Sequence, residues 1–216
     1  MDKHEWRKDE KELYNPKTEP SLISVPKQKY IMIDGMGNPN DEDFSDKISV
    51  LMSLSYGIKM MLKKEEAFEG YYDYSVYPLE GKWSFSEKEL ERMKQCEEED
   101  IKLNKEEFVY TIMVRQPDFI TEEIYNRAFE NVKKKKKELK YIDEARFEEC
   151  DEKLCVHIMH NGAFDNENIS FDMMKAFIHD NHLKIVSMVH REIYLKDSRK
   201  TAKDKLKTIL RYEVTK

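Results

Sequence analysis

The spacing of apolar residues predicts an alternation of strands and helices along the first half of the chain. Residues 29–35 form a β-rich run that closes in a turn at Gly35-Met36-Gly37-Asn38-Pro39. Apolar residues then recur at three- and four-residue spacing from Phe44 to Leu62, which predicts an amphipathic helix with Asp41 near its start. Strands are expected at residues 71–79 and 108–114, with a short helix after Ser86 inside the acidic segment 84–103.

The same order returns in the second half. Residues 154–162 predict a strand that closes in glycine, and a helix follows from about Asp165 with an apolar face. Further strands are expected at 185–189 or 190–195 and at 207–214. Tyr30–Gly35 and Val156–Gly162 hold matching positions in the two halves, so we interpret the chain as an internal duplication with a pseudo-two-fold axis. Each half alone would expose an apolar sheet face, so the halves must pack together and leave a ligand cleft at their junction.

This order predicts an α+β protein with the following domain organisation. Residues 1–20 are polar and form an N-terminal arm, and residues 21–216 form a single domain. Within this domain the first βαββ unit covers about 27–115, a connecting helix about 121–148, and the second βαββ unit about 150–216.

Composition narrows the classes of partner. The formal net charge is −6, and the 38% of charged residues mix both signs along the chain, which disfavours a nucleic-acid or anionic-membrane surface.

The sequence also predicts where the protein resides. No run of 18 apolar residues is present and the N-terminus lacks an apolar signal core, so a cytoplasmic protein is expected. Three cysteines, Cys96, Cys150 and Cys155, fit a reducing compartment. The sequence carries no recognisable metal or cofactor motif, and it leaves a homodimer open.

A carboxylate and a large ring follow one predicted strand. Glu80 and Trp83 come directly after Pro78-Leu79, where the strand of residues 71–79 ends. A ring that stacks and a carboxylate that neutralises charge suit a flat, hydrophobic or cationic small molecule. A surface glutamate beside a half-buried tryptophan is the alternative interpretation. The candidate walls of the site, each of which also suits a core position, are Trp83, Tyr74, Tyr77, Tyr110 and Met113.

A second carboxylate lies in the last third of the chain. His190, Glu192 and Tyr194 alternate with period two, so all three are expected on one face of a strand. If that face lines the cleft, burial would raise the pKa of Glu192 and suit it to acid–base chemistry. The alternative is a solvent-facing glutamate on an edge strand. Glu80 is the corresponding candidate in the first half, and paired carboxylates would suit either acid–base work or simple cation binding.

Several segments together resemble the GyrI-like small-molecule-binding family, which includes the effector-binding domains of AraC- and MerR-type regulators. The resemblance is to its stand-alone bacterial branch. The segments that carry it are residues 26–39, Tyr77-Pro78-Leu79-Glu80-Gly81-Lys82-Trp83, Arg115-Gln116-Pro117-Asp118-Phe119, His160-Asn161-Gly162-Ala163-Phe164 and residues 190–199. They span nearly the whole chain in the order that the family shows.

The resemblance implies a fold and two activities. The fold consists of duplicated βαββ units whose two antiparallel sheets form a central groove, with helices packed outside. Such a groove binds hydrophobic or cationic aromatic molecules between a glutamate and aromatic walls, and here it would include His160, Phe164 and Tyr194. Some stand-alone members instead hydrolyse the cyclopropyl ring of DNA-alkylating toxins, which would make Glu192 and Glu80 catalytic. The sequence leaves open whether the ligand is bound or turned over.

Two positions depart from the family pattern. The segment that begins at His160 commonly reaches a tyrosine, and here it reaches Phe164, so a ligand-binding hydroxyl is absent. The last segment usually ends in Asp-Pro-Arg, whereas this chain has Asp197-Ser198-Arg199.

A third hypothesis for the function is that the protein inhibits a larger enzyme by binding it through an acidic surface. This hypothesis rests on the net charge of −6 alone.

Overall fold

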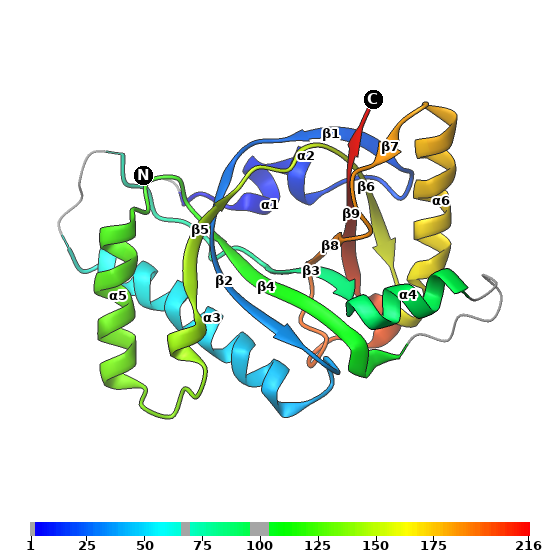
Figure 1. The fold of residues 1–216 in the computed structure, drawn as a ribbon. Helices are drawn as coiled ribbons and strands as arrows, with labels where there is room; N and C mark the ends of the chain where they lie inside the picture. The colour runs from blue at the N-terminus through cyan, green and yellow to red at the C-terminus, as the bar shows by residue number, and fades with distance from the viewer. Residues whose placement is uncertain (1–2, 66–69, 96–103) are drawn as a thin grey trace.

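A computed structural model describes residues 3–65, 70–95 and 104–216 (Figure 1). The helices are α1 (Trp6–Asp9), α2 (Lys11–Tyr14), α3 (Glu42–Leu62), α4 (Glu87–Gln95), α5 (Glu122–Lys135) and α6 (Glu167–Asp180). The strands are β1 (Ser21–Val25), β2 (Gln28–Met36), β3 (Leu79–Phe85), β4 (Phe108–Gln116), β5 (Arg146–Cys150), β6 (Lys153–Asn161), β7 (Lys184–Ile185), β8 (His190–Tyr194) and β9 (Lys207–Thr215). The α+β class predicted from the sequence is confirmed.

The strands form one antiparallel sheet in the order β1-β6-β9-β8-β3-β4-β2-β5, and β7 pairs with β9. The central pair, β3 with β8, joins the first half of the chain to the second, so the sheet is continuous where two sheets were expected. This pairing satisfies the backbone groups that two separate sheet edges would leave open. Outward from the centre, the strands β3, β4 and β2 of the first half are arranged as β8, β9 and β6 are in the second half.

Cross-strand register defines one face of the sheet. Residues that pair in neighbouring strands point to the same side. One such row runs across the sheet and consists of Ile33, Ile112, Gly81, Glu192, Leu210 and Ile158. We call this side the helical face, because α3 covers its first half and α6 its second.

Each of these helices packs on its own apolar cluster. Under α3, the buried residues include Leu51, Leu54 and Ile58 against the strand residues Ile33 and Ile112. The cluster under α6 joins Met174 and Ile178 to Val156, Ile158 and Leu210. The two helices lie far apart over the two halves of the sheet (Figure 1), so the central strands β3 and β8 carry the segment of the helical face that lies between them.

Glycines are required both in the turns that follow two strands and inside one strand. Gly37 after β2 and Gly162 after β6 have φ of 106° and 129°, a backbone conformation that favours glycine. The turn glycine that matches Gly162 is therefore Gly37, two residues beyond the predicted Gly35. Gly35 itself stays inside β2, where a Cβ atom would come 2.3 Å from the ring of Tyr110.

The N-terminal arm packs on the opposite side of the sheet, which we call the arm face. Trp6 and Tyr14 are buried, with ring centroids 5.1 Å apart, and the Trp6 indole donates a hydrogen bond to the carbonyl of Val76. Backbone hydrogen bonds also join the arm to the rest of the chain, one of them from Met159 N to the carbonyl of Lys17. The arm is thus an integral layer of the fold.

Two predicted elements differ from the structure. The strand predicted for 71–79 begins only at Leu79, because residues 71–78 run along the arm, where Tyr74 bridges to His4. The connecting helix ends at Lys135, and part of the remainder becomes β5, which pairs with β2. The short helix predicted after Ser86 is confirmed as α4, whereas Cys96 and the rest of the acidic segment to residue 103 lie outside the described residues.

The described part of the chain offers no helix with the length and apolar character needed to cross a bilayer.

Candidate functional site

The two predicted catalytic carboxylates lie on opposite faces of the sheet. Glu192 pairs with Gly81 and belongs to the helical face, whereas Glu80 pairs with Ile193 and points to the arm face. The expectation that both face one groove is therefore wrong. The period-two alternation within β8 was assigned correctly, but the register between β3 and β8 places the glutamates one residue out of step.

Glu192 sits at the centre of the helical face, where Gly81 has no side chain to cover it. Its carboxylate lies 3.0 Å from Nε2 of His190, and its side chain is 12% exposed. The Trp83 indole donates a 2.8 Å hydrogen bond to the hydroxyl of Tyr194. Burial of that hydroxyl and the neighbouring charge of Glu192 raise the pKa of Tyr194 well above its ordinary value. Tyr194 therefore stays neutral and available as a hydrogen-bonding group.

The Trp83 ring occupies space that Gly81 leaves free. A Cβ atom on Gly81 would come 2.5 Å from Nε1 of Trp83, which is far closer than van der Waals contact allows. The glycine therefore lets the indole lie flat over the strand and reach Tyr194. This explains why Glu80-Gly81-Lys82-Trp83 combines a small residue and a large ring in one strand.

Further rings surround Trp83. Phe44 from α3 and Phe108 and Tyr110 from β4 place their ring centroids 5.7, 5.6 and 5.2 Å from that of Trp83. Phe44 and Tyr110 meet edge to face at 5.0 Å. These separations are those of favourable aromatic pairs, so the rings form a coherent apolar wall beside Glu192. Phe44 and Phe108 extend the wall beyond the predicted Trp83 and Tyr110.

Glu167 is the residue that sequence reasoning missed. It begins α6, where the sequence predicts only a helix from about Asp165, yet the residue is buried, with 8% exposed. Its Oε1 atom has no hydrogen-bond partner among the described residues. Burial, followed by the charges of Glu192 and Asp165, raises the pKa of the Glu167 carboxyl to about 10. At neutral pH this carboxyl is therefore protonated.

His160 and Phe164 frame the start of α6. Nδ1 of His160 lies 2.9 Å from the Ser170 hydroxyl, and Nε2 lies 3.1 Å from the carbonyl of Ala163. Both ring nitrogens are thus committed to holding α6 against β6, which gives His160 a structural role in place of the predicted ligand contact. The Phe164 ring is 39% exposed and meets Tyr194 edge to face at 5.8 Å, so it forms the outer rim of the site.

Glu80 belongs to a buried ionic network on the arm face. Its Oε2 lies 3.2 Å from Nη1 of Arg191, and Arg191 also lies 2.8 Å from Glu152. Burial raises the pKa of Glu80, and the charges of Arg191 and Arg211 oppose that shift. The predicted wall residue Met113 pairs with Glu80 across the strands, so it lies on this face too.

Tyr77 and Tyr74 contact other groups than Glu192. The Tyr77 hydroxyl donates to Glu10 of the arm at 2.5 Å, and the guanidinium of Arg115 stacks 4.7 Å from its ring centroid. Tyr74 lies beside Phe119, with ring centroids 5.9 Å apart. Both tyrosines therefore stabilise the packing of the segment 71–78.

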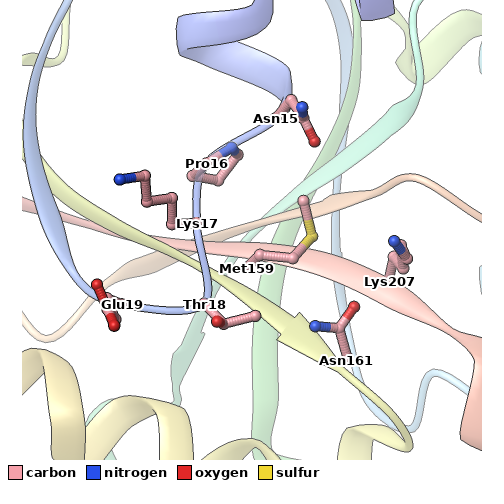
Figure 2. Close-up of a pocket in the computed structure, with 8 residues that line it drawn as sticks. All are labelled: Asn15, Pro16, Lys17, Thr18, Glu19, Met159, Asn161 and Lys207. Carbon is pink, nitrogen blue, oxygen red and sulfur yellow. The ribbon is translucent and has the colours of Figure 1, made fainter.

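Two hollows that the structure outlines lie away from Glu192. One of about 450 Å³ separates the arm from β6 and β9, and Figure 2 shows Asn15, Met159, Asn161 and Lys207 around it. Pro16, Lys17, Thr18 and Glu19 of the arm complete its lining. The second, of about 480 Å³, borders the C-terminal end of β9. Phe164, which is 39% exposed, marks the place where the helical-face site reaches the surface.

Comparison with solved structures places the chain in a family. No protein-family model and no curated protein matches it. An uncharacterized conserved protein from Listeria innocua is 34% identical over 99% of this chain and 100% of its own, with a TM-score of 0.85. The chain belongs to the family of this Listeria protein. Two structures described as a hydrolase from Listeria innocua are each 33% identical over the same shares, with TM-scores of 0.84 and 0.85.

A more distant neighbour of the Listeria family is the EcmrR C-terminal domain. It is 12% identical, covers 92% of this chain and 98% of its own, and has a TM-score of 0.50, which shows a shared fold alone. These neighbours are consistent with the GyrI-like fold that the sequence resemblance implies.

Proposed function

We propose that the protein binds hydrophobic aromatic small molecules, cationic ones among them, at the helical-face site of the GyrI-like fold. The observation that carries this proposal is that the largely buried Glu192 shares one sheet face with Trp83 and the rings packed around it. In the described part of the chain, the ionic partner recorded for Glu192 is His190, and no lysine or arginine pairs with it. A buried negative charge without a permanent counter-ion favours a cationic ligand.

The aromatic rings of the site provide a second attraction for a cationic ligand, in addition to the charge of Glu192. The face of an indole or phenol attracts a cation within about 6 Å of its centroid, and the attraction grows when water is excluded. Trp83 and Tyr194 share the sheet face of Glu192, and Tyr110 packs on Trp83, while Phe164 at the rim is accessible to an incoming ring. The site therefore offers apolar area for affinity and one charge for orientation.

Hydrolysis of a strained ring in DNA-alkylating toxins is the second candidate function. Two specific observations favour it: burial and the charge of Glu192 raise the pKa of Glu167 and keep that carboxyl protonated, and relatives with 33% identity over the full length are described as hydrolases. A neutral carboxyl group near a second carboxyl group suits acid–base chemistry. Glu192 would take a proton from the attacking water, and Glu167 would give one to the carbonyl oxygen that receives electrons as a cyclopropyl bond breaks.

A binding experiment tests the first function. We expect methyltriphenylphosphonium, a permanent aromatic cation, to bind more tightly than the neutral triphenylphosphine oxide. Glu192→Gln should weaken binding of the cation at least about tenfold, or ~1.4 kcal/mol, and leave the neutral compound unaffected. Glu130→Gln, on the exposed face of α5, is the matched control. Equal affinity for both compounds in the wild-type protein would contradict the proposal.

A product assay separates the two candidates. Incubation with a cyclopropane-bearing DNA alkylator should give ring-opened product if the protein is a hydrolase, and turnover should vanish in Glu192→Gln. Stoichiometric binding of the intact compound, without product, would leave binding as the function and exclude the second candidate for that compound.

A further inference from the structure

We propose that His190 is a positioning residue for Glu192, and that a proton on His190 weakens the binding of cationic ligands. The inference rests on the proposed function of the site, and it adds how the carboxylate is oriented and how pH controls it. His190 acts through Glu192 and need not touch the ligand itself.

A direct contact joins the two side chains. Nε2 of His190 lies 3.0 Å from Oε1 of Glu192, and the side chains are 19% and 12% exposed. An ionised carboxylate only accepts hydrogen bonds, so Nε2 carries the hydrogen and donates it. Hydrogen bonds to a charged group are about twice as strong as those between neutral groups, so this one sets the direction in which the Glu192 carboxylate points.

Rings from neighbouring elements fix the imidazole of His190. Phe171 of α6 meets it edge to face with ring centroids 4.8 Å apart, and Tyr212 of β9 lies at 6.0 Å. Trp83 of β3 pairs with His190 across the strands. These separations are those of favourable aromatic pairs, and the imidazole would lose them if it turned towards solvent. Nε2 is therefore held towards Glu192.

The neighbouring cations point to the arm face. Arg191 lies between His190 and Glu192 in β8, and it pairs with Lys82 of β3 and Arg211 of β9. Because side chains alternate along a strand and paired residues share a side, these three cations lie on the face opposite to His190. In the described part of the chain, the ionic contact recorded for His190 is the one with Glu192.

The other titratable groups on the surrounding elements keep their protonation state near neutral pH. Burial raises the pKa of Tyr212 on β9 to about 12 and that of Tyr194 on β8 well above its ordinary value. Burial, followed by nearby charges, raises the pKa of Glu167 on α6 to about 10. A second histidine of this face, His160 on β6, already has a partner for each ring nitrogen. Histidines ordinarily change charge between pH 5 and 8, so pH acts on Glu192 through its contact with His190.

The sign of the effect follows from these contacts. A neutral His190 leaves the pair with the single negative charge of Glu192, which attracts a cation. A protonated His190 makes the pair neutral and adds a positive charge to the site. Like charges disfavour each other, and a mutual effect of about one pKa unit corresponds to an affinity about tenfold lower for the cation. By linkage, a bound cation in turn disfavours the proton on His190.

Titrations of the wild-type protein at a series of pH values test the inference. From pH 5 to 8, affinity for methyltriphenylphosphonium should rise about tenfold and level off, whereas affinity for triphenylphosphine oxide should stay constant. Calorimetry in two buffers of different ionisation enthalpy should show proton release on binding of the cation near pH 6, and this release should disappear towards pH 8. Cation binding with equal affinity at every pH would overturn this inference and leave the proposed function intact. Absence of cation binding at pH 8 would overturn both.

Two variants identify the residue that carries the proton. His190→Gln keeps a hydrogen-bond donor and cannot titrate, so its affinity for the cation should be the same at pH 5.5 and 8. His190→Leu removes the donor as well, so at pH 8 it should bind the cation about fivefold more weakly than His190→Gln.

His179→Gln is the matched control. The side chain of His179 is 89% exposed near the end of α6, so this variant should keep the pH dependence of the wild-type protein. A pH dependence that persists in His190→Gln would overturn the control by His190, and equal affinity of His190→Gln and His190→Leu would overturn its positioning role. The wild-type titrations decide the inference on their own where a variant fails to fold.

Discussion

At the scale of single residues, the helical-face site contains a buried acid, Glu167. An apolar or amide side chain at this position would give a more stable folded protein. Glu167 is buried, and in the part of the chain that the structure describes one of its oxygens has no hydrogen-bond partner. Burial, and after it the charge of Glu192, raises the pKa of this carboxyl group. Its raised pKa means that the folded protein holds a proton that the unfolded chain releases above about pH 4.5. Stability is therefore lost as pH rises from that value towards 10.

Replacement of this acid gives a prediction on stability. Glu167→Gln should raise the free energy of unfolding at pH 8 by on the order of 1–3 kcal/mol and change it little at pH 4. Urea denaturation at both pH values measures the difference. An equal effect at the two pH values would show that Glu167 ionises normally in the folded protein. A residue kept at such a cost is typical of a functional site.

At the scale of elements, the N-terminal arm supplies charge as well as apolar area to the arm face. Glu10, between α1 and α2, forms an ion pair with Arg115 of β4, accepts a hydrogen bond from Tyr77 and lies 2.9 Å from Nε2 of His4. The Arg115 side chain is only 8% exposed, so its charge depends on this partner.

Loss of the Glu10 charge should therefore destabilise the protein. We expect Glu10→Gln to lower the free energy of unfolding by roughly 2–4 kcal/mol, because it leaves a buried guanidinium without its anion. Glu19→Gln, on the exposed part of the arm, should have almost no effect. Chemical denaturation of the two variants checks this. Equal stability of Glu10→Gln and the wild-type protein would mean that the arm is only loosely attached.

The elements also show what the sequence could predict. The helical periodicity that starts at Phe44 identified α3, and the period-two pattern placed His190, Glu192 and Tyr194 on one face. The position of Glu80 could not be predicted, because its face depends on the register between strands from different halves of the chain. The burial of Glu167 arises from the docking of α6 on the sheet, which local sequence does not encode.

At the scale of the whole molecule, the β3–β8 pair makes two similar halves into one folding unit. The larger apolar cluster contains Ile31 and Ile112 from the first half together with Met159, Ile193 and Ile209 from the second. Neither half can lose its structure without exposing part of this cluster. The site lies on the same junction, so its geometry depends on both halves.

A single unfolding transition follows from this arrangement. Tryptophan fluorescence, which reports on Trp6 in the arm and Trp83 in the centre, should change at the same denaturant concentration as the far-ultraviolet circular dichroism. Two separate midpoints would show that one half unfolds first and that the central strand pair contributes little to stability.

The central claim is that a cationic aromatic ligand binds on the helical face beside Glu192. A crystal structure with methyltriphenylphosphonium tests it most directly. We predict that the phosphorus lies near the Glu192 carboxylate, with a phenyl ring against Trp83 within about 6 Å of its centroid. A cation found in the hollow between the arm and β9, or on the arm face beside Glu80, would contradict the account.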